Sequence, residues 1–277
     1  MSADTSFLEK YKSASARNRS LLCVGLDPNP NHLPDSLKGR PDGISRFLTD
    51  IVSATSDLVC AYKPNFAFFG ALGESGFADL AGLIRNSPGD IPTILDFKAG
   101  DIGNTARRYA AMAYETLGAD ATTVNPLMGS DAVLPFLEYK GSCAFLLCLT
   151  SNPGSADFQR LETGDRTLYE AIAARAVEWS ESGDCGLVVG ATHPGELGGI
   201  RALAPGLPFL VPGVGAQGGN AEEVVRTGAD ADGGGLLINA SRAVLYASSG
   251  SDYAEAARQQ AERLRSTFEA ARASTPA

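Results

Sequence analysis

Four charged side chains are candidates for chemistry because their spacing would bring them together. Asp96 and Lys98 are two residues apart, Asp101 follows three residues after Lys98, and Lys63 comes directly after a separate apolar run. In an extended strand, Asp96 and Lys98 would share one face. Ammonium and carboxylate groups are costly to bury unless they pair. Four alternating charges exceed what a simple structural ion pair requires, so we expect a reacting centre here.

The elements that must position these residues are eight short apolar runs. The runs are continuous rather than alternating, which is typical of strands buried on both faces of a parallel sheet. They cover residues 21–26, 58–62, 91–95, 121–124, 143–149, 186–189, 208–211 and 236–238. Amphipathic stretches typical of helices lie between them, most clearly at residues 42–56, 106–117, 167–180 and 221–226.

Eight strands that alternate with helices, without a linker between halves, predict an α/β fold with one closed (β/α)8 barrel, the TIM barrel. We expect a single domain over residues 1–277, with a covering helix at 5–17 and a long closing helix at 253–273. The polar segment 152–165 is predicted to be a mobile loop or lid. The alternative architecture is an open doubly wound sheet.

Further polar residues follow the predicted strands at their C-terminal ends. Like the charged cluster, four more polar residues lie at or just beyond the end of a predicted strand: Asp27, Ser151, Gln217 and Arg242. Active sites of (β/α)8 barrels are built at that end of the strands. These residue types bind phosphate, hydroxyl or carboxylate groups, so the ring predicts an active site for a phosphate-bearing metabolite.

A glycine-rich segment at residues 212–220 contains a G-x-G-x-x-G match after the seventh predicted strand, and Asp232 lies near the offset of a ribose-binding acid. A dinucleotide site is disfavoured because no second mononucleotide-binding half follows. Barrels commonly hold phosphate after strands seven and eight, where backbone amides at a helix start suit an anion. Arg242 could also bind phosphate oxygens through a bidentate pair of hydrogen bonds.

Composition excludes several classes of partner. The net charge of −9 and the pI of about 4.8 disfavour nucleic acid and anionic lipid. Only two histidines are present, which makes a histidine-based zinc site improbable. The five cysteines lie in apolar runs without a C-x-x-C pair and are predicted to be buried free thiols. No apolar run approaches the ~18–20 residues of a membrane helix, so we expect a cytoplasmic protein.

With these residues in view, the chain resembles the orotidine 5′-phosphate decarboxylase family over residues 22–246. The most specific motif is LDFKAGDI at residues 95–102, which matches the family signature D-x-K-x-x-D-I. Supporting matches lie at residues 25–28, 62–65, 150–154, 213–219 and 241–242. The extended N-terminus and the helical insertions are similar to the longer bacterial subgroup.

The resemblance implies cofactor-independent decarboxylation of orotidine 5′-phosphate to uridine 5′-phosphate, the last step of de novo pyrimidine nucleotide synthesis, without a metal. It implies that Lys98 donates a proton to C6 of the pyrimidine as carbon dioxide leaves. Asp96 would lie beside the substrate carboxylate. Lys63 and Asp27 would hold the ribose hydroxyls and the charged network.

The remaining implied roles concern binding and assembly. Ser151 would contact the amide of the pyrimidine ring, while Gln217 and Arg242 would bind the 5′-phosphate. Asp101, Ile102 and Thr105 would reach into the active site of a partner subunit. The resemblance therefore implies a homodimer with shared active sites.

Three alternatives remain open at this stage. A metal-dependent sugar-phosphate lyase or synthase would use the carboxylates for Mg²⁺, although the nearby Lys63 disfavours a dication. A Schiff-base aldolase would use Lys98 as its nucleophile. A non-catalytic nucleotide binder would need none of the four charges, so their presence argues against it.

Overall fold

The computed structural model describes residues 5–192, 194–214 and 220–274. Within them, eight parallel strands are ordered β2-β1-β8-β7-β6-β5-β4-β3. The strands are β1 (Leu22–Gly25), β2 (Ala61–Lys63), β3 (Ile94–Ala99), β4 (Ala121–Val124), β5 (Cys143–Leu149), β6 (Cys185–Val189), β7 (Phe209–Pro212) and β8 (Leu236–Ala240).

Two parallel bridges close the sheet between its end strands β2 and β3. They pair Tyr62 with Thr93 and Asn65 with Asp96. The amide of Asp96 also donates to the carbonyl oxygen of Pro64, 2.9 Å away. The predicted (β/α)8 barrel is therefore confirmed, and the open doubly wound sheet is wrong.

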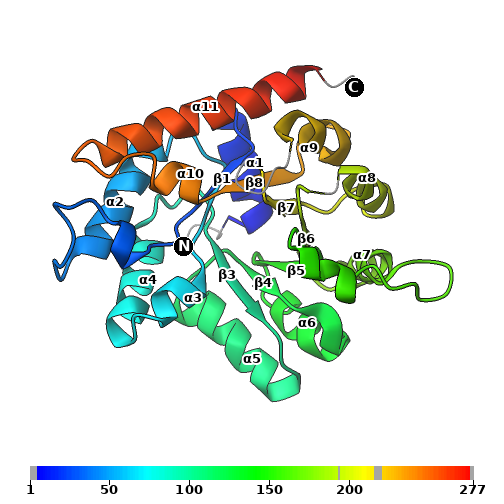
Figure 1. The fold of residues 1–277 in the computed structure, drawn as a ribbon. Helices are drawn as coiled ribbons and strands as arrows, with labels where there is room; N and C mark the ends of the chain where they lie inside the picture. Colours follow the sequence, from blue (N-terminus) through cyan, green and yellow to red (C-terminus); the bar gives the residue numbers. More distant parts are fainter. Residues whose placement is uncertain (1–4, 193, 215–219, 275–277) are drawn as a thin grey trace.

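Helices surround the barrel (Figure 1). They are α1 (Phe7–Asn18), α2 (Gly43–Thr55), α3 (Phe66–Gly70), α4 (Glu74–Asn86), α5 (Gly103–Ala111), α6 (Ser130–Leu137), α7 (Leu168–Trp179), α8 (Pro194–Leu203), α9 (Ala221–Gly228), α10 (Arg242–Leu245) and α11 (Tyr253–Ser274). Short 3₁₀ turns lie at Pro30–His32, Pro126–Met128 and Pro153–Asp157, and a π-helical turn at Met112–Thr116 continues α5. The long helix α11 packs against α2 and α9.

Unlike the helices around the barrel, α1 lies across one end of it and packs against the side chains of its interior. A capping box starts the helix. Ser6 Oγ accepts the amide of Glu9, and the carboxylate of Glu9 accepts the amide of Ser6. Phe7 and Tyr11 are buried in the cluster of side chains that fills the barrel, where Phe7 meets Phe145 edge to face. The helix therefore covers the N-terminal end of the strands.

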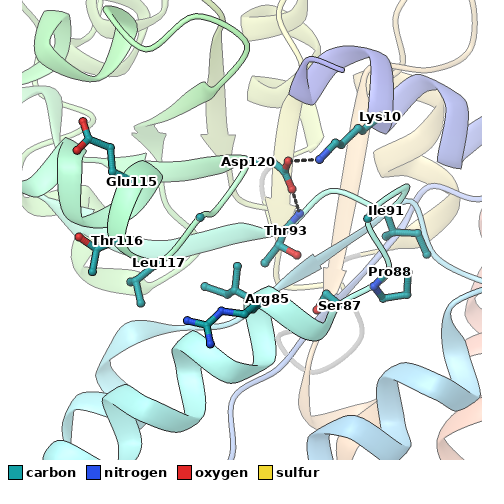
Figure 2. A pocket seen from close by; sticks show the side chains of 13 residues that line it. Lys10, Arg85, Ser87, Pro88, Ile91, Thr93, Glu115, Thr116, Leu117 and Asp120 are labelled. Carbon is teal, nitrogen blue, oxygen red and sulfur yellow. Dashed lines mark hydrogen bonds and ion pairs between the residues drawn. The ribbon is translucent and has the colours of Figure 1, made fainter. Parts of the chain in front are cut away.

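An ion pair fastens α1 to this end of the barrel (Figure 2). Lys10 Nζ lies 2.6 Å from Asp120 Oδ1, and the other oxygen of Asp120 accepts the amide of Thr93 at 2.8 Å. A cavity of about 450 Å³ opens beside the pair, with Arg85 and Glu115 in its wall. None of the predicted site residues lines it, and this end of a barrel usually serves stability.

Four strands, β2, β3, β7 and β8, end later than the sequence predicts, and the late ends of β2 and β3 contain charged residues. Lys63 is the last residue of β2, and β3 runs through Asp96 and Lys98 instead of stopping before them. For β2 and β3, the prediction was wrong because it ended each apolar run at its first charge. These charges remain within the sheet because Asp96 pairs with both Lys63 and Lys98.

The five cysteines are buried free thiols, as predicted. Burial raises the pKa of the Cys23 thiol to about 12, which leaves that thiol protonated at neutral pH. Among the described helices, none combines the length and the apolar character needed to cross a membrane.

Candidate active site

Asp96 is the centre of the charged cluster. Lys63 Nζ and Asn65 Nδ2 each donate to its Oδ2 at 2.9 Å. Lys98 Nζ and Thr123 Oγ1 donate to its Oδ1 at 2.5 Å and 3.0 Å. Both carboxylate oxygens therefore accept two hydrogen bonds, which fixes the orientation of the group.

The pKa values of this cluster follow from burial and from pairing. Burial alone would raise the pKa of Asp96, but the two ammonium groups outweigh it and hold that pKa well below its usual range. Burial alone would lower the pKa of Lys63, but Asp96 and Asp27 outweigh it and hold that pKa above its usual value. The Lys63–Asp96 pair is therefore fully charged at neutral pH.

The two lysines differ in access to solvent. The side chain of Lys63 is 5% exposed, whereas that of Lys98 is 46% exposed. An arriving molecule can therefore reach the ammonium group of Lys98, while Lys63 acts as a fixed charge behind Asp96.

Asp96 and Lys98 do meet, but not by the simple alternation that we expected. The register of β3 shifts against β4 between Leu95 and Ala99, and Lys98 adopts a left-handed backbone conformation with φ of +52°. A regular strand would hold the two side chains parallel. Here the bend brings the ammonium group onto the carboxylate. Phe97 lies on the helix side, as expected, against Phe66 and Tyr109.

Asp27 connects the cluster to a cavity of about 430 Å³. Its carboxylate accepts the amide of Asn65 at 3.1 Å, and the side chain of Asn65 donates to Asp96. The cavity wall includes Asp27, His32, Arg242 and other residues that follow β1, β7 and β8. The structure thus brings Asp27 and Arg242 to one cavity, next to the charged cluster.

Ser151 and Gln217 stand differently from the rest of the predicted ring. Ser151 follows β5, and its carbonyl oxygen accepts the hydroxyl of Thr192 at 3.4 Å, but Ser151 is not part of the cavity wall. Gln217 lies outside the described residues. Segment 152–165 contains a 3₁₀ turn, and its residue Glu162 forms a bridge with Thr167 just beyond it; its role as a lid stays a prediction.

Asp101 does not join the cluster of its own chain in the described part of the structure. Its carboxylate accepts the amide of Ile102 at 2.8 Å, just before α5. Three of the four charges therefore meet within one chain, and the place of Asp101 in the network stays a prediction. Ile102 and Thr105 are exposed at the start of α5. Ile102 is 51% exposed.

Sequence reasoning missed two residues that hold Asp96. Asn65 follows Lys63 by two positions, and its spacing from that lysine was the available signal. Thr123 is a polar residue within a fully buried strand, where an unpaired hydroxyl would be costly. Among the described residues, no group of three histidine, cysteine or acidic side chains could hold a metal ion.

The fold and the site define a (β/α)8-barrel enzyme with a fixed carboxylate–ammonium centre at the C-terminal ends of its strands. The family model described as Orotidine 5′-phosphate decarboxylase / HUMPS family matches residues 20–259. The chain belongs to this family and is a decarboxylase, a carboxy-lyase.

Relatives cover nearly the whole chain. It is 50% identical to the orotidine 5′-phosphate decarboxylase of Azoarcus sp. (strain BH72), over 96% of this chain and 99% of that relative. It is 51% identical to that of Roseiflexus castenholzii, over 96% of this chain and 98% of the relative. The solved structure of Leishmania donovani OMP decarboxylase superimposes with a TM-score of 0.87 at 41% identity, covering 98% of this chain and 100% of the other.

Proposed function

We propose that Lys98 donates the proton to C6 of the pyrimidine when this chain decarboxylates orotidine 5′-phosphate to uridine 5′-phosphate. The observation that carries the proposal is the difference between the two lysines on Asp96. Both are held by the same carboxylate, but only Lys98 is open to a bound substrate. A proton donor must come within hydrogen-bond reach of the atom that it protonates.

Fixed charges support the decarboxylation in the absence of a cofactor. Loss of carbon dioxide leaves an electron pair on a ring carbon, and preorganised positive charge stabilises it. Asp96 held ~4 Å from the substrate carboxylate would repel it by about 4 kcal/mol at an effective dielectric of 20. That repulsion disappears as carbon dioxide departs, and Lys98 can then protonate the carbon.

The binding roles follow from the cavity beside the cluster. Asp27 holds the ribose hydroxyls, since it lies between the cavity and the charged cluster, while the buried Lys63 holds the charged network behind it. Arg242, in the wall of the same cavity, binds the 5′-phosphate together with Gln217. Ser151 contacts the pyrimidine amide. The energy of phosphate binding can then contribute to the chemical step.

We propose further that the enzyme is a cytoplasmic homodimer with shared active sites and without nucleic acid or membrane partners. Asp101, Ile102 and Thr105 serve the site of the partner subunit. Within the described residues, the Asp101 carboxylate accepts the amide of Ile102 and does not contact the Asp96 cluster of its own chain, and Ile102 exposes half of its surface. Met128, also exposed, lies beside Gly100, so apolar surface adjoins Asp101.

A spectrophotometric assay of orotidine 5′-phosphate loss in excess chelator tests the function. We expect full turnover with the chelator, because the proposal uses no metal. Activity that disappears with the chelator would favour the metal-dependent lyase. Covalent trapping of Lys98 with borohydride and a carbonyl substrate would favour the Schiff-base aldolase. A folded sample without turnover would overturn the proposal.

A further inference from the structure

We infer that Thr123 is a positioning residue whose hydroxyl holds the 96–98 segment in the shape that aims Lys98. The inference rests on the proposed role of Lys98 as proton donor. Thr123 lies on β4, 1% exposed, and does not belong to the predicted ring of site residues.

The pairing of β3 with β4 explains why a side chain is needed here. Leu95 pairs with Thr122, and Ala99 pairs with Val124. Three residues of β3, at positions 96–98, therefore oppose the single residue Thr123. A regular ladder cannot satisfy the extra amides of such a bulge.

The hydroxyl of Thr123 satisfies two of these amides. The amides of Phe97 and Lys98 both donate to Oγ1, at 3.0 Å and 2.9 Å. The third amide, that of Asp96, donates instead to the carbonyl oxygen of Pro64. The side chain of Thr123 therefore replaces the missing rungs of the ladder.

The same hydroxyl also reaches the reacting charges. A threonine hydroxyl has two lone pairs and one proton. Because two amides take the lone pairs, the proton is directed to Asp96 Oδ1, 3.0 Å away. That oxygen is the one that Lys98 Nζ contacts. One hydroxyl thus fixes the left-handed backbone of Lys98 and the carboxylate that receives its side chain.

Loss of this hydroxyl should affect the chemical step more than binding. The cavity that holds the ribose and phosphate is lined by other residues. Lys98 would be released from its bend and would meet C6 less often. Misplacement of a reacting group by 1 Å can cost about 100-fold in rate.

Thr122 provides a matched control on the same strand. It is fully buried, and its hydroxyl donates to the carbonyl oxygen of Leu95 at 2.8 Å. Thr122→Val therefore removes one buried hydrogen bond between the same two strands. It leaves the amides of residues 97 and 98 and the carboxylate of Asp96 with their partners.

The experiment compares Thr123→Val, Thr123→Ser and Thr122→Val in the full chain. For each variant we would measure kcat and KM for orotidine 5′-phosphate, the Kd of uridine 5′-phosphate, and Tm. For Thr123→Val we expect kcat to fall about 10- to 100-fold with KM and Kd within about threefold. Thr123→Ser keeps the hydroxyl and should keep kcat within about threefold of the wild-type value. Thr122→Val should also keep kcat within about threefold of wild type, even with a lower Tm. If Thr123→Val does not fold, Thr123→Cys replaces it, with a weaker donor and acceptor and a smaller loss of kcat.

Wild-type kcat in Thr123→Val, or an equal loss of kcat in Thr122→Val, would overturn the inference. Lys98→Ala, measured alongside, separates this failure from that of the proposed function. If Lys98→Ala is inactive while Thr123→Val is fully active, only the inference fails. If Lys98→Ala keeps wild-type turnover, the proton-donor role fails and the inference with it.

Discussion

Lys63 and Asp96 form a buried ion pair, with 2.9 Å between Nζ and Oδ2, at the junction where β2 and β3 close the barrel. Burial of two charges gives little net stability, because the cost of removing them from water offsets their attraction. Such a pair therefore points to a use beyond stability. The other carboxylate oxygen of Asp96, Oδ1, accepts a hydrogen bond from Lys98, the lysine that faces solvent.

Asp96→Asn should destabilise the fold by about 3–5 kcal/mol at pH 7, because it leaves Lys63 buried without a counter-charge. The pKa of Asp96 is lowered in the folded state. Its stabilising contribution is therefore complete above the unfolded pKa of about 3.9 and is lost as pH falls through the folded pKa. In urea unfolding, the difference between wild type and variant should shrink from pH 7 to pH 3. Asp35→Asn, at an exposed carboxylate, is the control. A difference that is the same at both pH values would contradict the assignment.

Lys98→Ala should lower kcat by at least about 10³-fold, since both the proton donor and a fixed positive charge are lost. The affinity for uridine 5′-phosphate should fall much less, because other residues line the cavity. Turnover and product binding are measured on the same preparation. Lys38→Ala, which removes an exposed lysine paired with Asp35, should leave both unchanged. Retention of more than a tenth of wild-type kcat would contradict the proton-donor role.

Much of the fold could be predicted because it depends on apolar periodicity. The eight buried runs and the helices around them required only the pattern of apolar and polar residues. The ends of the strands were predicted less well, because the burial of a charge within a sheet depends on partners far away in the sequence. Lys63 can end β2 inside the sheet only because Asp96 lies on the adjoining strand.

The site was predicted in its residue types and less well in its geometry. Asp96 and Lys98 were identified from spacing, but the bend that joins them depends on Thr123, 25 residues after Lys98. A propensity argument does not anticipate a left-handed lysine, because that conformation is costly for a residue with a side chain. The contribution of Asp101 could not be located within one chain, since its proposed target belongs to a second one.

Mixed dimers should test whether Asp101 serves the partner subunit. Asp101→Ala and Lys98→Ala should each be nearly inactive alone. After random mixing of subunits, about half of the dimers carry one intact site of two, so about a quarter of wild-type activity should return. Activity is measured against mixing ratio after refolding both variants together. Mixed samples that stay at the level of the separate variants would contradict a shared site.

Arg201→Met should destabilise the barrel without a direct effect on chemistry. The Arg201 guanidinium donates to backbone carbonyl oxygens of Ala204, Pro205, Leu207, Gly228 and Gly235. Its Cζ also lies 3.6 Å from the centre of the Phe209 ring. Loss of these bonds leaves buried acceptors unsatisfied, and we expect a cost of about 2–4 kcal/mol in urea unfolding. Arg175→Met, on the exposed face of α7, should cost less than about 0.5 kcal/mol. An Arg201→Met protein as stable as wild type would contradict this role.

Arg242→Ala should weaken recognition of the phosphate specifically. Arg242 is exposed at the start of α10, in the wall of the cavity that adjoins Asp27. Loss of a charge-assisted pair should raise KM for orotidine 5′-phosphate about 10- to 100-fold. Orotidine, which lacks the phosphate, should be turned over slowly and equally by wild type and variant. The two substrates are compared by kcat/KM under identical salt. An equal loss on both substrates would mean that Arg242 acts on the fold or on the ribose. A loss confined to the phosphorylated substrate would assign Arg242 to the phosphate, and a fall in kcat along with the rise in KM would show that remote binding energy is used in the chemical step.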